Sequence, residues 1–414
     1  MPDFDFDQFS GKRIVLLQGP VGPFFRQLAD ALKAAGATVS KINFNAGDWF
    51  FFPRHAINYR GTMQAWPSWF RRFCENERVD AVLLFGDCRP IHRDAHAVAV
   101  DLGIDVGVFE EGYIRPNYVT LERHGVNGHS RLPRNAEAYH AQPACGYHEV
   151  EVGRTYWQMV WCGFRYFTAG ALGALIFPHY RHHRPLALLE ALPWLRSVWR
   201  KQWYRLAERS VFAELSSASS PPFFLVPLQV FNDAQIVEHS RYADVAEFIR
   251  ETAISFATHA AKDALLVFKH HPMDRGYRDY ASLIAQLNAT LGTQGRIRYI
   301  HDQHLPSLLT SAQGVVVINS TVGLSAIAYG TATKVCGRAI YDIAGLSFQG
   351  ALDAFWRAAH SARPDPELLA RFQLHVIQRT QLNGSFYKPL RLSSAVAGLL
   401  WPSARTSPPQ NTAQ

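Results

Sequence analysis

The sequence predicts an α/β protein of two domains, and three observations support this fold class. The chain has 414 residues. A single hydrophobic core rarely supports a chain of this length, which suits two domains of about 150–200 residues each. Short apolar segments alternate with segments of helical periodicity in both halves of the chain, which predicts parallel sheets covered by helices on both faces. The serine- and proline-rich stretch at residues 216–222 separates the two series as a linker would.

The N-terminal series predicts a Rossmann-like domain over residues 1–150. Its predicted strands are apolar and short, at residues 13–20, 38–44, 79–87 and 104–112. Its predicted helices have apolar residues at helical spacing, at residues 23–36, 66–73 and 92–103. Gly36 and Gly103 suit the position just after a helix C-terminus. The usual GxGxxG phosphate motif is absent from this half.

The C-terminal series predicts a second Rossmann-like domain over residues 221–395. Its predicted strands lie at residues 223–230, 264–272, 297–302, 314–320 and 333–337. Its predicted helices lie at residues 242–261, 280–290 and 305–312, with one more starting near Thr321. The polar, proline-containing tail at 396–414 is expected to be disordered. Two Rossmann-like halves joined by a linker resemble the GT-B architecture, whose ligands bind in a central cleft at the carboxyl ends of the strands.

Residues 151–220 interrupt the α/β rhythm and are expected to be a helical insertion rich in aromatic and basic side chains. Residues 157–177 are nearly long enough to cross a bilayer, but they contain Arg165 and three glycines. A buried or interfacial helix is therefore favoured over a membrane span.

Further along this insertion, six basic residues are interleaved with Trp and Leu against one acidic residue, Glu190. They are Arg181, Arg184, Arg196, Arg200, Lys201 and Arg205. This pattern is typical of a helix lying on anionic lipid. A helical subdomain with its arginines on a solvated face is the alternative.

Composition and charge limit the classes of partner. Hydrophobic residues make up 48% of the chain and charged residues 18%, and the formal net charge is +8. This globular, basic composition favours an anionic partner such as a nucleotide phosphate or an anionic lipid. Nucleic acid is disfavoured, because no RRM, KH or zinc-finger pattern is present. Five scattered cysteines without a CxxC pair, and an N-terminus without an apolar leader, predict a cytoplasmic protein with no disulfide framework and no metal site.

Polar residues follow several predicted strands, at the positions where ligands bind to an open parallel sheet. In the first half they are Asp87, Glu110 and Glu111. In the second half they are Lys269, His270, His271, Pro272, Asn319, Ser320, Thr321 and Gly323. Each group taken singly could equally be loop chemistry, with carboxylates and hydroxyls capping helices and proline forming a turn.

Each group also suits a function. Ser320 and Thr321 precede an apolar helix, whose free N–H groups suit a phosphate, and Gly323 would allow close approach of a ligand. His271 beside Pro272 suits a hydrogen bond to phosphate or ribose, with His270 as the rival. Glu110 and Glu111 are neighbours in a strand, so only one of them is expected to face the ligand.

The order of these motifs resembles that of CMP-sugar-dependent GT-B transferases, which carry an acidic pair before glycine, then His-Pro, then Ser/Thr. Segments spread over residues 13–390 resemble one family more closely, the KpsS/LipB capsule polysaccharide biosynthesis proteins. These segments are LLQGPVGPFF, INFNAGDWFFFP, LLFGDCRP, VFEEGYIRP, VNGHSRLPR, VPLQVFND, FKHHPMDRG and INSTVGLSAIAYGTATKVCGRAIYD.

This resemblance implies a transferase that moves β-Kdo from CMP-Kdo onto lyso-phosphatidylglycerol at the inner membrane. It implies that His271, Ser320 and Thr321 bind the donor and that Glu111 carries the chemistry, with Glu110 and Asp87 as rivals. CMP-Kdo carries its sugar in the β configuration, so a β-linked product means net retention, and the carboxylate is then either a nucleophile or, as in inverting sialyltransferases, a general base. No cofactor or metal is expected, and the partners would be the membrane surface and a capsule synthesis and export complex. Both acidic positions are Glu here, where related transferases often have Asp second.

Two other functions fit the same sequence features. One is a transferase with another nucleotide-sugar donor, which a donor screen would distinguish. The other is a scaffold of the capsule export machinery without catalysis, which has no need of the acidic pair and both phosphate-type motifs.

Overall fold

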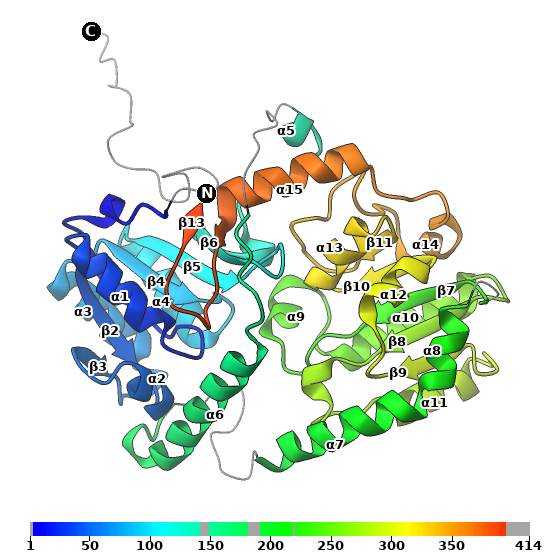
Figure 1. Ribbon diagram of the computed structural model, residues 1–414, viewed down its shortest axis with the longest axis horizontal. Helices are drawn as coiled ribbons and strands as arrows, with labels where there is room; N and C mark the ends of the chain where they lie inside the picture. The colour runs from blue at the N-terminus through cyan, green and yellow to red at the C-terminus, as the bar shows by residue number, and fades with distance from the viewer. Residues whose placement is uncertain (1–2, 141–148, 181–190, 218–219, 395–414) are drawn as a thin grey trace, which may run out of the picture. The chain divides into compact units, whose positions relative to one another are not determined.

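The computed structural model describes residues 3–140, 149–180, 191–217 and 220–394 and divides them into two compact units (Figure 1). Unit 1 contains the described residues of 3–131, 149–180 and 373–394. Unit 2 contains those of 132–140, 191–217 and 220–372. Each unit has its own sheet, which confirms the predicted α/β class with two Rossmann-like halves. The predicted cleft stays a prediction.

Unit 1 is built on an eight-stranded sheet of order β13-β12-β6-β5-β4-β1-β2-β3. Five parallel strands form most of it: β1 (Arg13–Leu16), β2 (Thr38–Asn43), β3 (Ala56–Asn58), β4 (Ala81–Phe85) and β5 (Asp105–Glu111). Three antiparallel strands extend it: β6 (Tyr118–Arg123), β12 (Gln381–Asn383) and β13 (Ser393–Ser394). The parallel strands end at one edge, where the acidic motifs follow them.

Helices cover both faces of this sheet. The helices of this unit are α1 (Phe24–Ala34), α2 (Ala46–Phe51), α3 (Trp66–Glu77), α4 (Pro90–Asp101) and α6 (Tyr156–Leu172), with short 3₁₀ turns η1 (Asp7–Phe9), η2 (Asn127–His129) and η3 (Ala174–Ile176). Alternate residues of β1 enter different cores: Ile14 packs in the cluster with Phe24, and Val15 in the cluster with Trp66. Period-two alternation thus buries both faces of the sheet.

Unit 2 has a five-stranded, fully parallel sheet of order β11-β10-β7-β8-β9. The strands are β7 (Phe223–Pro227), β8 (Leu265–Lys269), β9 (Ile297–Ile300), β10 (Gly314–Val317) and β11 (Ala332–Val335). The helices are α5 (Glu137–His140), α7 (Ala191–Ala207), α8 (Arg209–Leu215), α9 (Ala234–His239), α10 (Val245–His259), α11 (Ala281–Thr290), α12 (Leu305–Ser311), α13 (Thr321–Ala328) and α14 (Leu352–Ala358), with the turn η5 (Pro272–Asp274). Every residue of β7 and β8 is buried. This explains their continuous apolar sequences.

The predicted domain boundaries at 150, 220 and 395 differ from the observed division. Helix α15 (Pro366–Thr380) starts in unit 2 and ends in unit 1, where β12 pairs with β6. The insertion at 151–220 is helical as expected, but α6 belongs to unit 1 and α7 and α8 to unit 2. Arg181, Arg184 and the tail at 396–414 lie outside the described residues. Among the helices that the structure describes, none is long and apolar enough to cross a membrane.

Candidate functional site

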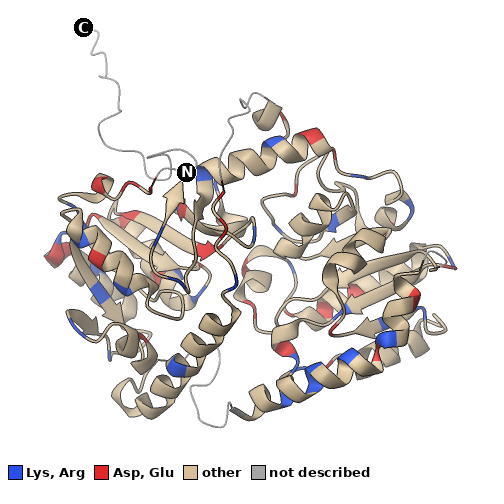
Figure 2. Cartoon of the chain, viewed as in Figure 1, with Lys and Arg blue, Asp and Glu red and all other residues tan. Residues whose placement is uncertain are grey.

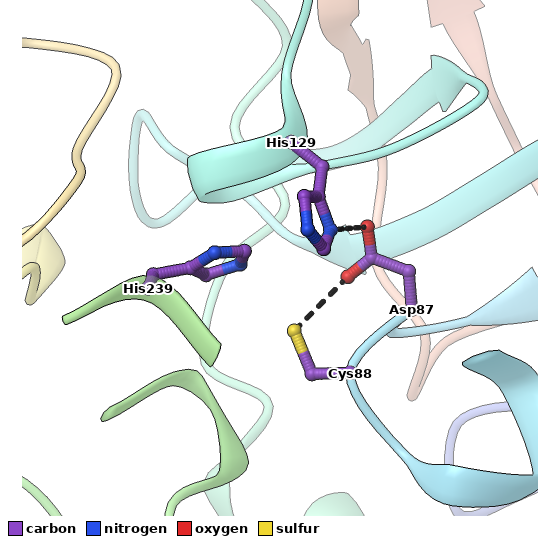
Figure 3. Close-up of side chains that lie close together, drawn as sticks. All are labelled: Asp87, Cys88, His129 and His239. Atoms are coloured by element: carbon purple, nitrogen blue, oxygen red, sulfur yellow. Dashed lines mark hydrogen bonds and ion pairs between the residues drawn. The ribbon is translucent and has the colours of Figure 1, made fainter. Parts of the chain in front are cut away.

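Asp87 lies just after β4 in unit 1, and its carboxylate is almost fully buried. Its Oδ2 accepts hydrogen bonds from His129 Nδ1 at 3.0 Å and from the backbone N–H of Val126 at 3.1 Å. Cys88 Sγ lies 3.3 Å from Oδ1 (Figure 3). His239, which is also drawn in Figure 3, belongs to unit 2. Burial would raise the pKa of Asp87, but the bonds from His129 and Val126 outweigh it and lower this pKa below its usual value. Asp87 is therefore ionised at neutral pH.

The hydrogen bond between His129 and Asp87 determines which ring nitrogen of His129 carries the proton. An ionised carboxylate can only accept, so His129 Nδ1 carries the proton and donates it to Asp87. The other ring nitrogen, Nε2, is then the basic one, and the side chain is 38% exposed. A histidine oriented by a buried carboxylate is the arrangement that general-base catalysis requires.

Glu110, near the end of β5, points toward the same loop. A Cβ atom on Gly86, the residue before Asp87, would lie 3.4 Å from Glu110 Oε2. Glu110 Oε1 accepts the backbone N–H of Glu111 at 3.0 Å. Burial, together with the charges of Glu111 and Asp87, raises the pKa of Glu110 to about 7, although the hydrogen bond from the Glu111 N–H and the charge of Arg89 oppose the rise. Glu110 and Asp87 are thus two carboxyl groups whose environments move their pKa values apart, a pattern typical of acid–base sites.

Glu111 has a different environment. Burial raises its pKa, and the charge of Arg115 opposes the rise. Glu111 also contributes to the raised pKa of Tyr387, on the segment that returns to unit 1. The two neighbouring glutamates are therefore unequal, as alternation along a strand requires, and Glu110 is the one beside Asp87.

The sequence patterns did not single out two residues of this region, His129 and Arg89. His129 was not singled out, because its partner Asp87 is 42 positions away and no spacing rule links them; its place in the segment VNGHSRLPR was the one available signal. Arg89, which follows Asp87 closely, was also missed. Its Nη1 donates to Gln18 Oε1 at 2.9 Å, so its guanidinium is held near the acidic loop.

In unit 2, the structure separates the two adjacent histidines. His270 is buried, its Nδ1 lies 2.5 Å from the hydroxyl of Tyr299, and burial lowers its pKa to about 3. His271 is half-buried, and its Nδ1 accepts the backbone N–H of Met273 at 3.1 Å, which caps η5 at Pro272. Lys269 is buried and its Nζ donates to the carbonyl oxygen of His301 at 2.9 Å. Of the two histidines that follow the carboxyl end of β8, His271 is therefore the less buried.

The Ser-Thr motif lies at the same edge of that sheet. Ser320 caps α13 by accepting the N–H of Val322 at 3.2 Å, and Thr321 is the first helical residue. The central strand β7 separates β8 from β10, so the strands before His271 and Ser320 are about 10 Å apart. The order of the sheet reverses beside β7, which is where ligands bind in open α/β sheets.

Two other predicted residues of this motif have local partners. Asn319 Nδ2 donates to the carbonyl oxygen of Gln235 at 3.0 Å. The proposed reason for Gly323, close approach of a ligand, needs correction. A Cβ at this position would collide with the ring and hydroxyl of Tyr341, so the glycine makes room for that side chain.

Four of the six basic residues predicted for the membrane lie on α7, where Figure 2 shows basic positions along the helix; they are Arg196, Arg200, Lys201 and Arg205. Arg196 donates to the carbonyl oxygen of Gly276, and Arg200 Nη1 donates to that of Arg275 at 2.9 Å. Lys201 and Arg205 are exposed. Two of the four therefore hold the helix on unit 2, and two face solvent.

The structure and its sites define a two-unit α/β protein with polar side chains gathered at the carboxyl ends of both sheets. The chain belongs to the capsule polysaccharide biosynthesis protein family, whose profile matches residues 80–387. The capsule polysaccharide export protein KpsS of Escherichia coli is 40% identical over 389 residues, covering 91% of this chain and 97% of that protein. The capsule polysaccharide modification protein LipB of Neisseria meningitidis serogroup B is 39% identical over 388 residues, covering 91% and 92%. The family resemblance predicted from the sequence is thus confirmed.

The chain also resembles solved structures at low sequence identity. The β-Kdo 2,7 transferase of KpsC from Thermosulfurimonas dismutans matches with a TM-score of 0.45 and 15% identity, covering 93% of this chain and 96% of that one. The β-Kdo 2,4 transferase of the same protein matches with a TM-score of 0.40 and 12% identity, covering 87% and 88%.

Proposed function

We propose that this protein is a glycosyltransferase that moves a Kdo residue from CMP-Kdo to the hydroxyl of a (lyso)phosphatidylglycerol acceptor, with retention of configuration. The observation that carries the proposal is the oriented Asp87–His129 pair with Glu110 beside it, at the carboxyl edge of the parallel strands of unit 1. Family membership and the resemblance to CMP-sugar transferases support the capsule context and the donor.

Retention by this site takes two displacements. The Glu110 carboxylate attacks the anomeric carbon, and CMP leaves with the bonding electron pair, which gives a glycosyl-enzyme ester. His129 Nε2 then takes the proton of the acceptor hydroxyl, whose oxygen attacks the same carbon and releases Glu110. Asp87 acts through His129 by fixing its tautomer. Glu111 is the rival nucleophile. We expect no metal requirement, because a single phosphate can be neutralised by a helix N-terminus and basic residues.

The direct test is a reaction of the purified full chain with CMP-Kdo and a fluorescent lyso-phosphatidylglycerol. Mass spectrometry of the lipid is expected to show the addition of Kdo. Product with a UDP- or GDP-sugar, and none with CMP-Kdo, would identify a different transferase. No product and no CMP release with any donor would favour a scaffold.

On the donor side, His271→Ala is expected to weaken CMP binding about 10- to 150-fold, because one charge-assisted hydrogen bond contributes about 1.5–3 kcal/mol. Isothermal titration of CMP into the apo protein measures the change. The exposed His360→Ala is the matched control and should bind CMP as the wild type does. An unchanged affinity in His271→Ala would refute this assignment.

On the acceptor side, replacing Lys201 and Arg205 by Gln is expected to weaken binding to anionic vesicles at low salt about 30-fold. Each exposed basic residue near such a surface contributes about 1 kcal/mol, and the loss should disappear as salt screens the charges. Co-sedimentation measures it. The control replaces Arg250 and Lys262, two exposed basic residues elsewhere on unit 2, by Gln. Equal losses in both variants would mean that α7 is an ordinary solvated helix.

A further inference from the structure

Helix α6 of unit 1 packs through its small residues. Gly163 and Gly170 are buried, together with Tyr166. The hydroxyl of Tyr166 accepts from Asn45 Nδ2 at 2.7 Å and donates to Asp48 Oδ1 at 3.1 Å. A Cβ added to Gly47 of α2 would collide with the Tyr166 ring, so α2 and α6 are in close contact. This face fixes α6 firmly to the unit.

The opposite face of α6 is large, apolar and exposed. Its side chains recur at helical spacing and continue into η3: Trp157, Trp161, Phe164, Leu172 and Leu175. Trp157 is 76% exposed and Leu175 is 95% exposed. On the neighbouring α2, Trp49 and Phe50 are also exposed. We call the exposed apolar residues of α6, η3 and α2 the aromatic face. Soluble monomers rarely leave such a set of large apolar side chains in water.

Along α6 and η3 the charges have one sign. No Asp or Glu occurs at residues 155–180, and Figure 2 shows one basic band on α6. The one basic residue of α6 is Arg165. The central carbon of its guanidinium lies 4.7 Å from the centre of the Trp161 ring. Trp and Arg side by side, without carboxylates, suit the headgroup region of an anionic bilayer, where indole N–H groups and guanidinium groups stay polar while the rings are buried.

A second helix has the same character. On α7 of unit 2, Leu195, Trp199 and Trp203 are exposed, and residues 191–207 contain no Asp or Glu. Helices of this composition, aromatic and basic without carboxylates, are typical of surfaces that contact anionic lipid. This similarity favours lipid over protein as the occupant.

We propose that the aromatic face of α6 is a membrane-docking surface that inserts into the interface of a bilayer containing anionic lipid. Arg165 binds lipid phosphate, and Trp157, Trp161 and Phe164 reach the upper acyl chains. The docking is mainly hydrophobic and persists at salt concentrations that screen α7. It does not depend on the transferase reaction.

The test is flotation of the full chain with vesicles of phosphatidylglycerol and phosphatidylcholine at about 0.5 M salt, where the Debye length is well below 10 Å. The variant Trp157→Ser/Trp161→Ser/Phe164→Ser is expected to lose about 10-fold or more of its vesicle affinity. The matched control replaces three exposed apolar residues of unit 2, Val237, Ile254 and Tyr329, by Ser, and should bind as the wild type does.

A second variant, Trp157→Ser/Leu175→Ser, changes the two most exposed of these side chains and should show a smaller loss in the same direction. Lipids brominated near the carbonyl groups should quench tryptophan fluorescence in the wild type, and less in Trp157→Phe. Unchanged vesicle binding in both Ser variants would overturn the proposal. So would self-association of the wild type, seen by sedimentation, that both Ser variants abolish without any change in vesicle binding.

Discussion

Asp87→Asn is expected to lower turnover by at least about 10³-fold, some 4 kcal/mol of barrier, with little change in CMP affinity. Asn has the size of Asp, and its amide oxygen can take the place of Oδ2 and still accept from both the N–H of Val126 and Nδ1 of His129. The amide is uncharged, however, so the negative charge beside the His129 ring is lost. The imidazolium that forms when Nε2 takes a proton would then lack its counter-charge, and His129 could no longer act as an effective base.

Single-turnover rates with saturating donor measure this loss. Cys88→Ser is the matched control, because Cys88 contacts the carboxylate oxygen that does not bond His129. Added imidazole should restore part of the activity of His129→Gly, and less of it when Asp87 is also Asn. A double variant no slower than either single variant would show that the two residues act as a unit. An Asp87→Asn enzyme with more than about a tenth of wild-type turnover would exclude the role.

Glu110→Gln is expected to lose a comparable 10³-fold or more in turnover, and Glu111→Gln considerably less. Glu110 points toward the loop that carries Asp87, whereas the charge of Arg115 acts on Glu111. Because the pKa of Glu110 is raised to about 7, wild-type turnover should rise with pH through this region as the nucleophile ionises. Initial rates from pH 5.5 to 8.5 measure the profile. A larger loss in Glu111→Gln would restore the assignment made from the resemblance.

The same shift predicts an effect on stability. A carboxyl group whose pKa is raised on folding contributes stability below its unfolded pKa of about 4.5, and loses it as pH rises through the folded pKa. Glu110→Gln should therefore be more stable than the wild type at pH 8, by up to about 3 kcal/mol at 1.36 kcal/mol per pKa unit, and nearly equal to it at about pH 4. Glu111→Gln should show a smaller gain. Thermal melts of both variants at both pH values provide the comparison.

Trapping the intermediate distinguishes the carboxylates directly. Enzyme quenched in acid with excess CMP-Kdo should carry one Kdo, which peptide fragmentation should place on Glu110. Glu110→Gln should carry none, and Asp87→Asn should accumulate the adduct, because its second displacement lacks a base. An adduct on Asp87 or Glu111 would move the nucleophile to that residue.

Local patterns predicted most of the secondary structure, and long-range contacts explain what they missed. The apolar segments that became β1, β4, β5, β7 and β8 are buried over most of their length, so their apolar composition identifies them. Strand β6 was missed, because its antiparallel partners on either side are β5 and the distant β12. Similarly, alternation predicted that Glu110 and Glu111 differ. Their surroundings depend on the register of β5 against β4, where Phe109 pairs with Phe85, and no local pattern shows that register.

The placement of β12 has a consequence for how the chain is made. Gln381 on β12 bonds to Thr120 on β6, 261 positions earlier, so the sheet of unit 1 is complete only after nearly the whole chain has left the ribosome. Unit 2, whose sheet lies entirely within residues 223–335, can fold during synthesis. Until then β6 is an open edge, and such edges invite pairing with other chains. A chain that stops at residue 372 should therefore aggregate through unit 1 while unit 2 folds.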